Sequence, residues 1–275
     1  MTNIRAGFGV NTYSYTFTGT ALDTVARLAD QCYGGVELMF FPGHLWPADL
    51  SETDLRKLRD LCEQRLRLVA VNMPNIDMNI AAAAEEMRSY TLGLLVQFVR
   101  CAGELGANGI IIGPGKANPL FPMSRDRMMS HFYRALDRLA PLAREVGTRL
   151  LVENMPFAFL PDADALMHAI DGYGDGTIRV IYDVANAHFI GEAPSQGLQR
   201  VRDRLDLVHF SDTTRQAYRH DPFGHGDVPL EGLADVMRDV GYAEVPMLEV
   251  ISPQPDTDIR DSCDRLHRAG IGRVA

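Results

Sequence analysis

The sequence predicts a single-domain (β/α)8 TIM barrel that extends over residues 1–275. Two observations support this prediction. Short apolar runs typical of buried strands alternate with amphipathic helical stretches along the whole chain. The strand-plus-helix unit recurs eight times, at a spacing of roughly 30 residues, and eight is the number that closes such a barrel. A doubly wound open sheet is the alternative, but it would not bring four consecutive strand ends around one point.

The first half of the chain supplies four of these units. Strands are expected at 6–10, 35–40, 67–72 and 109–113, with helices at 21–32, from Ser51 onward, at 82–105 and at 124–146. The Ser-Glu-Thr-Asp order that begins at Ser51 resembles a capping box. Pro141 lacks a backbone donor and clashes one turn back, so it is expected to bend or split the last of these helices.

In the second half, each expected strand ends on a metal-type ligand. The runs 149–153, 179–183, 206–209 and 247–249 end on Glu153, Asp183, His209 and Glu249, and helices are expected at 162–170, 195–204, 230–240 and 256–267. One such residue alone would be interpreted as a helix cap or an arginine partner. Four at equivalent positions would converge at the C-terminal end of a barrel. Carboxylates with one imidazole suit a divalent cation such as Mn²⁺, Mg²⁺ or Co²⁺.

Composition narrows the classes of partner. The formal net charge is −9 and no Lys/Arg-rich run occurs, which disfavours a nucleic-acid partner. No apolar stretch approaches the roughly 18 residues that span a bilayer, and the first residues lack a signal-peptide pattern, so a cytoplasmic location is expected. The four cysteines are scattered and predict reduced thiols. The pair Met128-Met129 fits either helix packing or a subunit surface, so a homo-oligomer is left open.

Further polar residues are candidates for substrate binding. Asn186 and His188 follow the ligand Asp183, and His220 lies in a Gly-punctuated loop that is rich in donors and that could also be a solvated turn. Asn72 ends the third strand and could bind a substrate hydroxyl. Two residues have a structural alternative: Glu37, at the end of the second strand, could form an ion pair, and His44, in an aromatic loop, could lie in a packed seam.

Several motifs together resemble one family. They are Val152-Glu153-Asn154, Tyr182-Asp183-Val-Ala-Asn186, Val208-His209-Phe-Ser-Asp212, His220-Asp-Pro-Phe-Gly224-His-Gly226, Leu248-Glu249 and Gly35-Val-Glu37. This combination resembles the xylose isomerase-like TIM barrels, the sugar phosphate isomerase/epimerase group. The resemblance implies that Glu153, Asp183, His209 and Glu249 hold one divalent metal ion (Mn, Mg, Co or Zn). It also implies that Glu153 and Glu249 are the catalytic acid/base pair and that Arg215 and His188 contact the substrate.

The function that follows is a metal-dependent isomerase or epimerase. Proton transfer next to a carbonyl, through an enediolate, would act on a ketose, a keto-polyol or another small carbohydrate. A lyase of the inosose or 3-dehydroshikimate dehydratase type, which would use the same site, is the second hypothesis. A non-catalytic carbohydrate-binding barrel is the third hypothesis. The trinuclear endonucleases of the superfamily need further ligands where this chain has Asn72, Gly113, Asn186 and Tyr218. Few loop lysines and arginines favour an unphosphorylated substrate.

Overall fold

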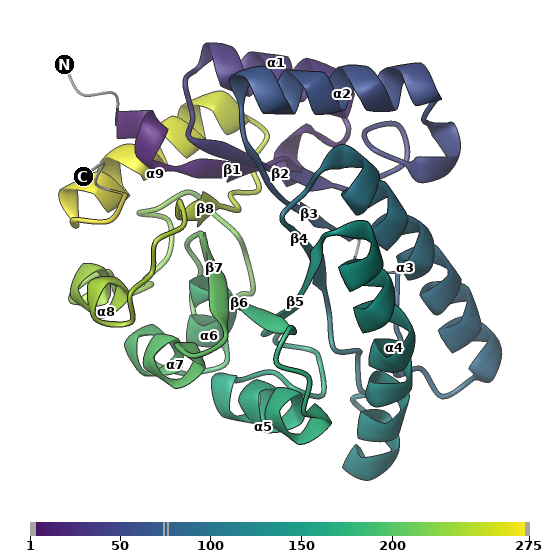
Figure 1. The fold of residues 1–275 in the computed structure, drawn as a ribbon. Helices are drawn as coiled ribbons and strands as arrows, with labels where there is room; N and C mark the ends of the chain where they lie inside the picture. The colour runs from purple at the N-terminus through teal and green to yellow at the C-terminus, as the bar shows by residue number, and fades with distance from the viewer. Residues whose placement is uncertain (1–3, 74, 76, 273–275) are drawn as a thin grey trace.

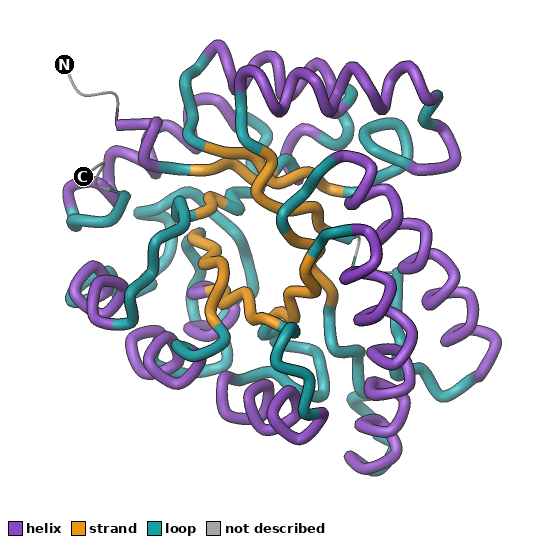
Figure 2. The backbone as a smooth tube through the Cα atoms, in the orientation of Figure 1, coloured by secondary structure: helices purple, strands orange, loops and turns teal. Residues whose placement is uncertain are grey.

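The computed structural model describes residues 4–73, 75 and 77–272. Within this part of the chain, parallel strands close into a barrel in the order β1 to β8, and β8 pairs with β1. Figure 1 shows the helices arranged around the outside of this barrel, and Figure 2 shows the strands as its inner ring. The strands are β1 (Gly9–Asn11), β2 (Gly35–Met39), β3 (Leu68–Asn72), β4 (Gly109–Ile112), β5 (Arg149–Glu153), β6 (Arg179–Asp183), β7 (Leu205–Phe210) and β8 (Met247–Leu248). The predicted TIM barrel is confirmed.

The helices follow the strands as expected, with one addition. They are α1 (Ala21–Asp30), α2 (Glu52–Arg65), α3 (Glu85–Leu105), α4 (Arg125–Val146), α5 (Ala163–Tyr173), α6 (Val184–Phe189), α7 (Pro194–Val201), α8 (Leu233–Asp239) and α9 (Pro255–Arg268). The side chains of Thr20, Ser51, Ser124 and Asp162 cap the first turns of α1, α2, α4 and α5. Helix α6 was not predicted, because its six residues are too few to show a periodic pattern.

Pro141 lies inside α4 without splitting it. The residue is exposed, and so is Asp137, whose carbonyl loses its helical donor at this point. Water can solvate that carbonyl, while Leu136, Leu139 and Ala140 on the opposite face stay buried. Packing of the apolar face therefore outweighs the lost hydrogen bond.

The barrel interior is built in layers along the strands. A small apolar cluster inside the barrel contains Val69, Ala70, Ile111, Leu151, Ile181, Leu207 and Met247. Side chains of a strand alternate between its two faces, so the residue two positions further on shares the interior. For Leu151, Ile181, Leu207 and Met247 that next residue is Glu153, Asp183, His209 and Glu249. The strand period thus stacks a polar layer directly on an apolar one, at the C-terminal end.

The larger apolar core lies between the strands and the helices, and three of the four cysteines are buried. Cys62, Cys101 and Cys263 are buried, and Cys32 is exposed. No helix in the described part of the chain is both long enough and apolar enough to span a membrane.

Candidate metal centre

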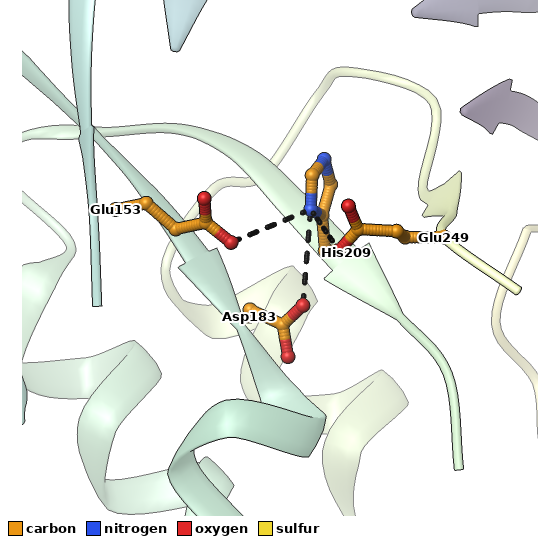
Figure 3. A group of neighbouring side chains, drawn as sticks. All are labelled: Glu153, Asp183, His209 and Glu249. Atoms are coloured by element: carbon orange, nitrogen blue, oxygen red, sulfur yellow. Dashed lines mark hydrogen bonds and ion pairs between the residues drawn. The ribbon is translucent and has the colours of Figure 1, made fainter. Parts of the chain in front are cut away.

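Four ligand-type side chains meet at the C-terminal end of the barrel. Glu153 and Asp183 are the last residues of β5 and β6, His209 is the penultimate residue of β7, and Glu249 follows β8 directly. One ligand atom from each lies within 4.8 Å of the others. All four residues are buried, and Figure 3 shows the three carboxylates directed toward the His209 ring. The structure thus brings together the four residues that the sequence singled out.

The donor set fits a divalent cation. His209 Nδ1 lies 3.1 Å from Glu249 Oε2 and 3.8 Å from both Glu153 Oε1 and Asp183 Oδ2. Asp183 Oδ1 accepts a hydrogen bond from the backbone of Asn186 at 2.7 Å, but its Oδ2 is buried with no hydrogen-bond partner among the described residues. A buried carboxylate oxygen without a donor is costly unless a cation completes its surroundings. These residues could therefore hold one metal ion.

The three carboxylates have different electrostatic environments. Burial, followed by the charge of Glu249, raises the pKa of Glu153 well above its usual range. Burial also raises the pKa of Asp183, to about 6. Burial acts in the same direction on Glu249, but the neighbouring His209 and His220 outweigh it and lower its pKa to about 2. Glu249 is the carboxylate that stays ionised most readily, and Glu153 is the one that retains a proton most readily.

A fourth carboxylate contacts the His209 imidazole at the nitrogen that faces away from the other three. Glu37 Oε2, from β2, lies 2.7 Å from His209 Nε2. The side-chain amides of Asn11 and Asn72 donate to the other oxygen of Glu37 at 2.5 and 2.9 Å. Burial would lower the pKa of His209, but Glu37 and Glu249 outweigh it and hold that pKa well above its usual value. Glu37 therefore lies beside the centre in contact with His209, and Asn72 lies behind Glu37 and contacts it.

His220 lies at the edge of the cluster. Its Nδ1 is 3.3 Å from Glu249 Oε2 and 3.0 Å from the hydroxyl of Ser211. Its Nε2 is 3.0 Å from the hydroxyl of Tyr218. His220 thus joins Glu249 to Tyr218. Sequence reasoning missed Tyr218 as a site residue, although its position two residues before a candidate histidine was an available signal.

His188 and Asn186, both in α6, flank the cluster on another side. Asn186 donates to Glu153 Oε1 at 3.3 Å and to the backbone oxygen of Asn154 at 2.9 Å. His188 Nε2 pairs with Asp227 Oδ1 at 2.7 Å. Asn186 Oδ1 and His188 Nδ1 are buried and have no hydrogen-bond partner among the described residues. Neither atom has its hydrogen-bonding capacity satisfied within the described residues.

Two predicted substrate contacts lie apart from this cluster. His44 Nδ1 is 2.7 Å from the backbone oxygen of Gly19, and its Nε2 is 3.0 Å from the Thr12 hydroxyl. Both ring nitrogens are therefore engaged within the fold. Arg215 is exposed in the loop after β7. The contacts of neither residue connect it to the four clustered ligands, and their substrate roles stay predictions.

Asp212 assembles the loop that carries His220. Its Oδ2 accepts hydrogen bonds from the backbone of Gly224 and Gly226 at 2.7 and 2.9 Å, and its Oδ1 accepts one from Val228 at 3.1 Å. A Cβ at Gly226 would lie 2.2 Å from the backbone oxygen of Thr213, so only glycine fits there. The Gly-punctuated motif is thus explained by the fold of the loop.

A pocket opens beside the centre, at the C-terminal ends of β3, β4 and β5. It is lined by Met73, Asn75, Met78, Ile80, Gly113, Gly115, Lys116, Met155, Pro156, Phe157, Ala158 and Tyr218. Tyr218 forms one wall, and its ring packs against Phe157 and Phe189 at centroid distances of 5.4 and 5.2 Å. The pocket comes from loop residues that strand patterns do not reveal.

Comparison with known proteins identifies the family. The family model described as "Xylose isomerase-like TIM barrel" matches residues 25–269. The chain belongs to this family. The resemblance found in the sequence is therefore confirmed, over nearly the whole chain.

Individual relatives are distant but cover the chain well. Fructoselysine 3-epimerase of Shigella flexneri is 20% identical over 246 residues, which are 85% of this chain and 87% of that protein. The crystal structure of a D-tagatose 3-epimerase-like protein aligns with a TM-score of 0.81 and 17% identity, over 95% of this chain and 96% of that one. The apo structure of the 3-keto-D-glucoside 4-epimerase of E. coli aligns at 0.79 and 18%, over 95% and 99%. At such identities the structural matches establish the fold.

Proposed function

We propose that this protein is a divalent-metal-dependent isomerase or epimerase that acts on a ketose or keto-polyol by proton transfer next to a carbonyl. One observation carries the proposal. Glu153 and Glu249 lie on opposite sides of His209 in Figure 3, and the ligand atoms of both belong to one buried cluster whose members lie within 4.8 Å of one another. Two carboxylates placed on opposite sides of a bound sugar can serve as an acid and a base. The epimerases among the relatives support the same class of reaction.

Each residue of the centre has a role in this proposal. Glu153, Asp183, His209 and Glu249 would hold the metal ion. A divalent cation there supplies positive charge that offsets the negative charge of an enediolate. One of Glu153 and Glu249 would remove the proton next to the carbonyl. The other would deliver a proton from the opposite side, and this inverts the carbon.

The surrounding polar groups would orient the sugar. His188 Nδ1 and Asn186 Oδ1 are buried and unpaired within the described chain, so both can bond substrate hydroxyls. Arg215 would reach the substrate from its loop, as the family pattern implies. His220 would hold Glu249 by its contact at 3.3 Å. Glu37 would position His209, and Asn72 would position Glu37.

A dehydratase is the second candidate, because the same centre could begin its reaction. Removal of the proton by Glu249 would be followed by loss of a β-hydroxyl, which needs a proton donor. Glu153, on the opposite side of the cluster from Glu249, would be that donor. The two reactions differ in product: an isomerase conserves water, and a lyase releases it with formation of a conjugated enone.

The test is deuterium incorporation from D₂O into ketoses and cyclic keto-polyols, after the metal content of the protein has been measured. We expect exchange that requires the metal and falls by about 10²-fold or more in Glu153→Gln and in Glu249→Gln. Glu231→Gln, at an exposed glutamate, serves as the matched control. Full exchange in Glu249→Gln would refute the two-carboxylate scheme. Sugar binding without any exchange would instead favour a non-catalytic barrel.

A further inference from the structure

The pocket beside the centre is far more apolar than an unmodified sugar requires. Its walls include Met73, Met78, Ile80 and Met155, together with the ring of Phe157. Met73, Met78 and Ile80 are buried, whereas Phe157 is 59% exposed at the mouth. Ligand pockets lined mainly by apolar side chains bind apolar groups and use a few polar atoms for orientation.

The polar groups of this pocket are few, and two of them are engaged within the protein. Lys116 directs its amine to the backbone oxygen of Asn75 at 2.6 Å, across the pocket wall. The hydroxyl of Tyr218 is within hydrogen-bond distance of His220 Nε2. A row of sugar hydroxyls inside the pocket would therefore lose water without gaining enough partners.

The pocket is adjacent to the metal centre and separate from it. None of the four clustered ligands is among its lining residues. Tyr218 connects the two regions through His220, which contacts Glu249. Met155 follows Glu153 by two residues. A sugar held at the cluster would consequently leave this space to whatever is attached to the sugar.

Gly113, directly after β4, lets two wall residues approach the end of the strand. A Cβ at this position would lie 2.7 Å from Asn75 Oδ1 and 2.8 Å from Met155 Sδ. Any side chain here would therefore have to displace the wall. The glycine thus fixes how closely the pocket wall packs against the barrel.

We propose that the natural substrate is a carbohydrate that carries an apolar substituent, alkyl or aryl, and that this substituent occupies the pocket lined by Met73, Met155 and Phe157. The proposal rests on the carbohydrate chemistry proposed above and specifies the substrate class. Methionine side chains are flexible and polarisable, so the walls adapt to groups of different shape. The pocket therefore accepts both linear and ring substituents.

The experiment uses two matched series of probes with the Mn²⁺-supplemented protein. These are the methyl, butyl, hexyl and benzyl ethers of D-fructose at O1, and the same ethers at O6. Binding is measured by calorimetry, and deuterium uptake from D₂O is recorded with the same compounds. We expect affinity in at least one series to rise by about threefold per methylene, with benzyl also bound more tightly than methyl.

A pair of variants locates the effect. Phe157→Ser removes an exposed aromatic wall of the pocket and should shrink the ratio of hexyl to methyl affinity severalfold. Phe17→Ser, at an aromatic residue that is 82% exposed and does not line the pocket, should keep the ratio of the unsubstituted protein. An unchanged ratio in Phe157→Ser would overturn the assignment to this pocket.

The two readouts separate the two proposals. Equal affinity across both series, absence of binding included, overturns the apolar subsite whatever the exchange shows. Rising affinity without any deuterium uptake upholds the subsite and contradicts the proposed reaction. Deuterium uptake with flat affinity upholds the reaction and contradicts the subsite.

Discussion

Glu37 Oε2 lies 2.7 Å from Nε2 of His209. Glu37 is on β2 and His209 is on β7, so the contact crosses the point where β8 pairs with β1 and closes the barrel. If Nε2 donates to the carboxylate, the lone pair of the imidazole is on Nδ1. Nδ1 is the atom that lies nearest the other three ligands. The contact between Glu37 and His209 would then select the tautomer that a metal ion at Nδ1 requires.

Glu37→Gln should weaken divalent-metal binding by about 10–100-fold. The side chains of Asn11 and Asn72 both donate to Oε1 of Glu37, so a glutamine would keep its oxygen there and turn its amide nitrogen, a donor, toward His209 Nε2. Calorimetric titration with Mn²⁺ measures the effect, and the exposed Glu231→Gln is the control. An unchanged affinity would show that the carboxylate does not position His209.

Glu153→Gln should stabilise the protein in the absence of metal. Because the pKa of Glu153 is raised in the folded state, its ionised form destabilises folding at neutral pH, and glutamine removes that penalty. We expect a gain of at least about 1 kcal/mol in metal-free unfolding free energy. The same variant should lose the stabilisation by metal, which is about 2.7 kcal/mol at 100 times Kd for the unsubstituted protein. Denaturant titrations with and without EDTA measure both effects. Unchanged metal-free stability, or full stabilisation by metal in the variant, would contradict the prediction.

His188→Phe should raise KM by roughly tenfold or more, because a buried unpaired nitrogen would no longer be available to a substrate hydroxyl. Asp227→Asn keeps the imidazole and changes only its partner, whose side chain is 61% exposed. A smaller effect is expected there. If both variants have normal kinetics, His188 does not contact the substrate.

His44→Ala should lower stability by about 1–2 kcal/mol and leave kcat/KM within about threefold. Both ring nitrogens bridge the chain between Gly19 and Thr12, and burial lowers the pKa of this imidazole, so it is neutral. Thermal unfolding and steady-state kinetics measure the two effects. A large kinetic defect in a protein of normal stability would instead support the substrate contact predicted from the sequence.

Glu244→Gln should lower stability by about 0.5–1 kcal/mol at neutral pH and by nothing in acid. Two-point contact with Arg67 outweighs burial and lowers the pKa of Glu244. A depressed pKa stabilises the fold above the unfolded-state value, and this contribution disappears as the pH falls through the folded-state value. Urea titrations of both proteins from pH 7 to pH 3 should converge. A constant difference would exclude the ion pair as its source.

The clustering of Glu153, Asp183, His209 and Glu249 could be predicted because two short-range rules determine it. Strand periodicity places Asp183 two residues beyond Ile181, on the same face, and parallel strands of a barrel all end at one rim. The sequence contains both facts. The placement of Glu37 against His209 could not be predicted, because it depends on strand registers between residues that are 172 positions apart.

The loops were the least predictable part. The roles of Tyr218 and Met155 depend on how three loops fold against one another, and no residue period reports that arrangement. Helix α6 begins at Val184, and Asp183 is both its N-cap and a member of the four-residue cluster. The sequence pattern indicated that Asp183 ends a strand, but it did not indicate that the same residue starts a helix.

The two backbone hydrogen bonds between Asp212 and Asp221, each 2.8 Å long, tie together the ends of the segment that contains Tyr218. Thr213 adds contacts to Ala217 and Arg219 at 2.9 and 3.0 Å. The segment between these hydrogen bonds is thus held by its own contacts and by its two ends. Replacing residues 214–219 with the equivalent segment of another barrel of the family would change the pocket wall that Tyr218 forms. The cluster of three carboxylates and His209 would stay assembled.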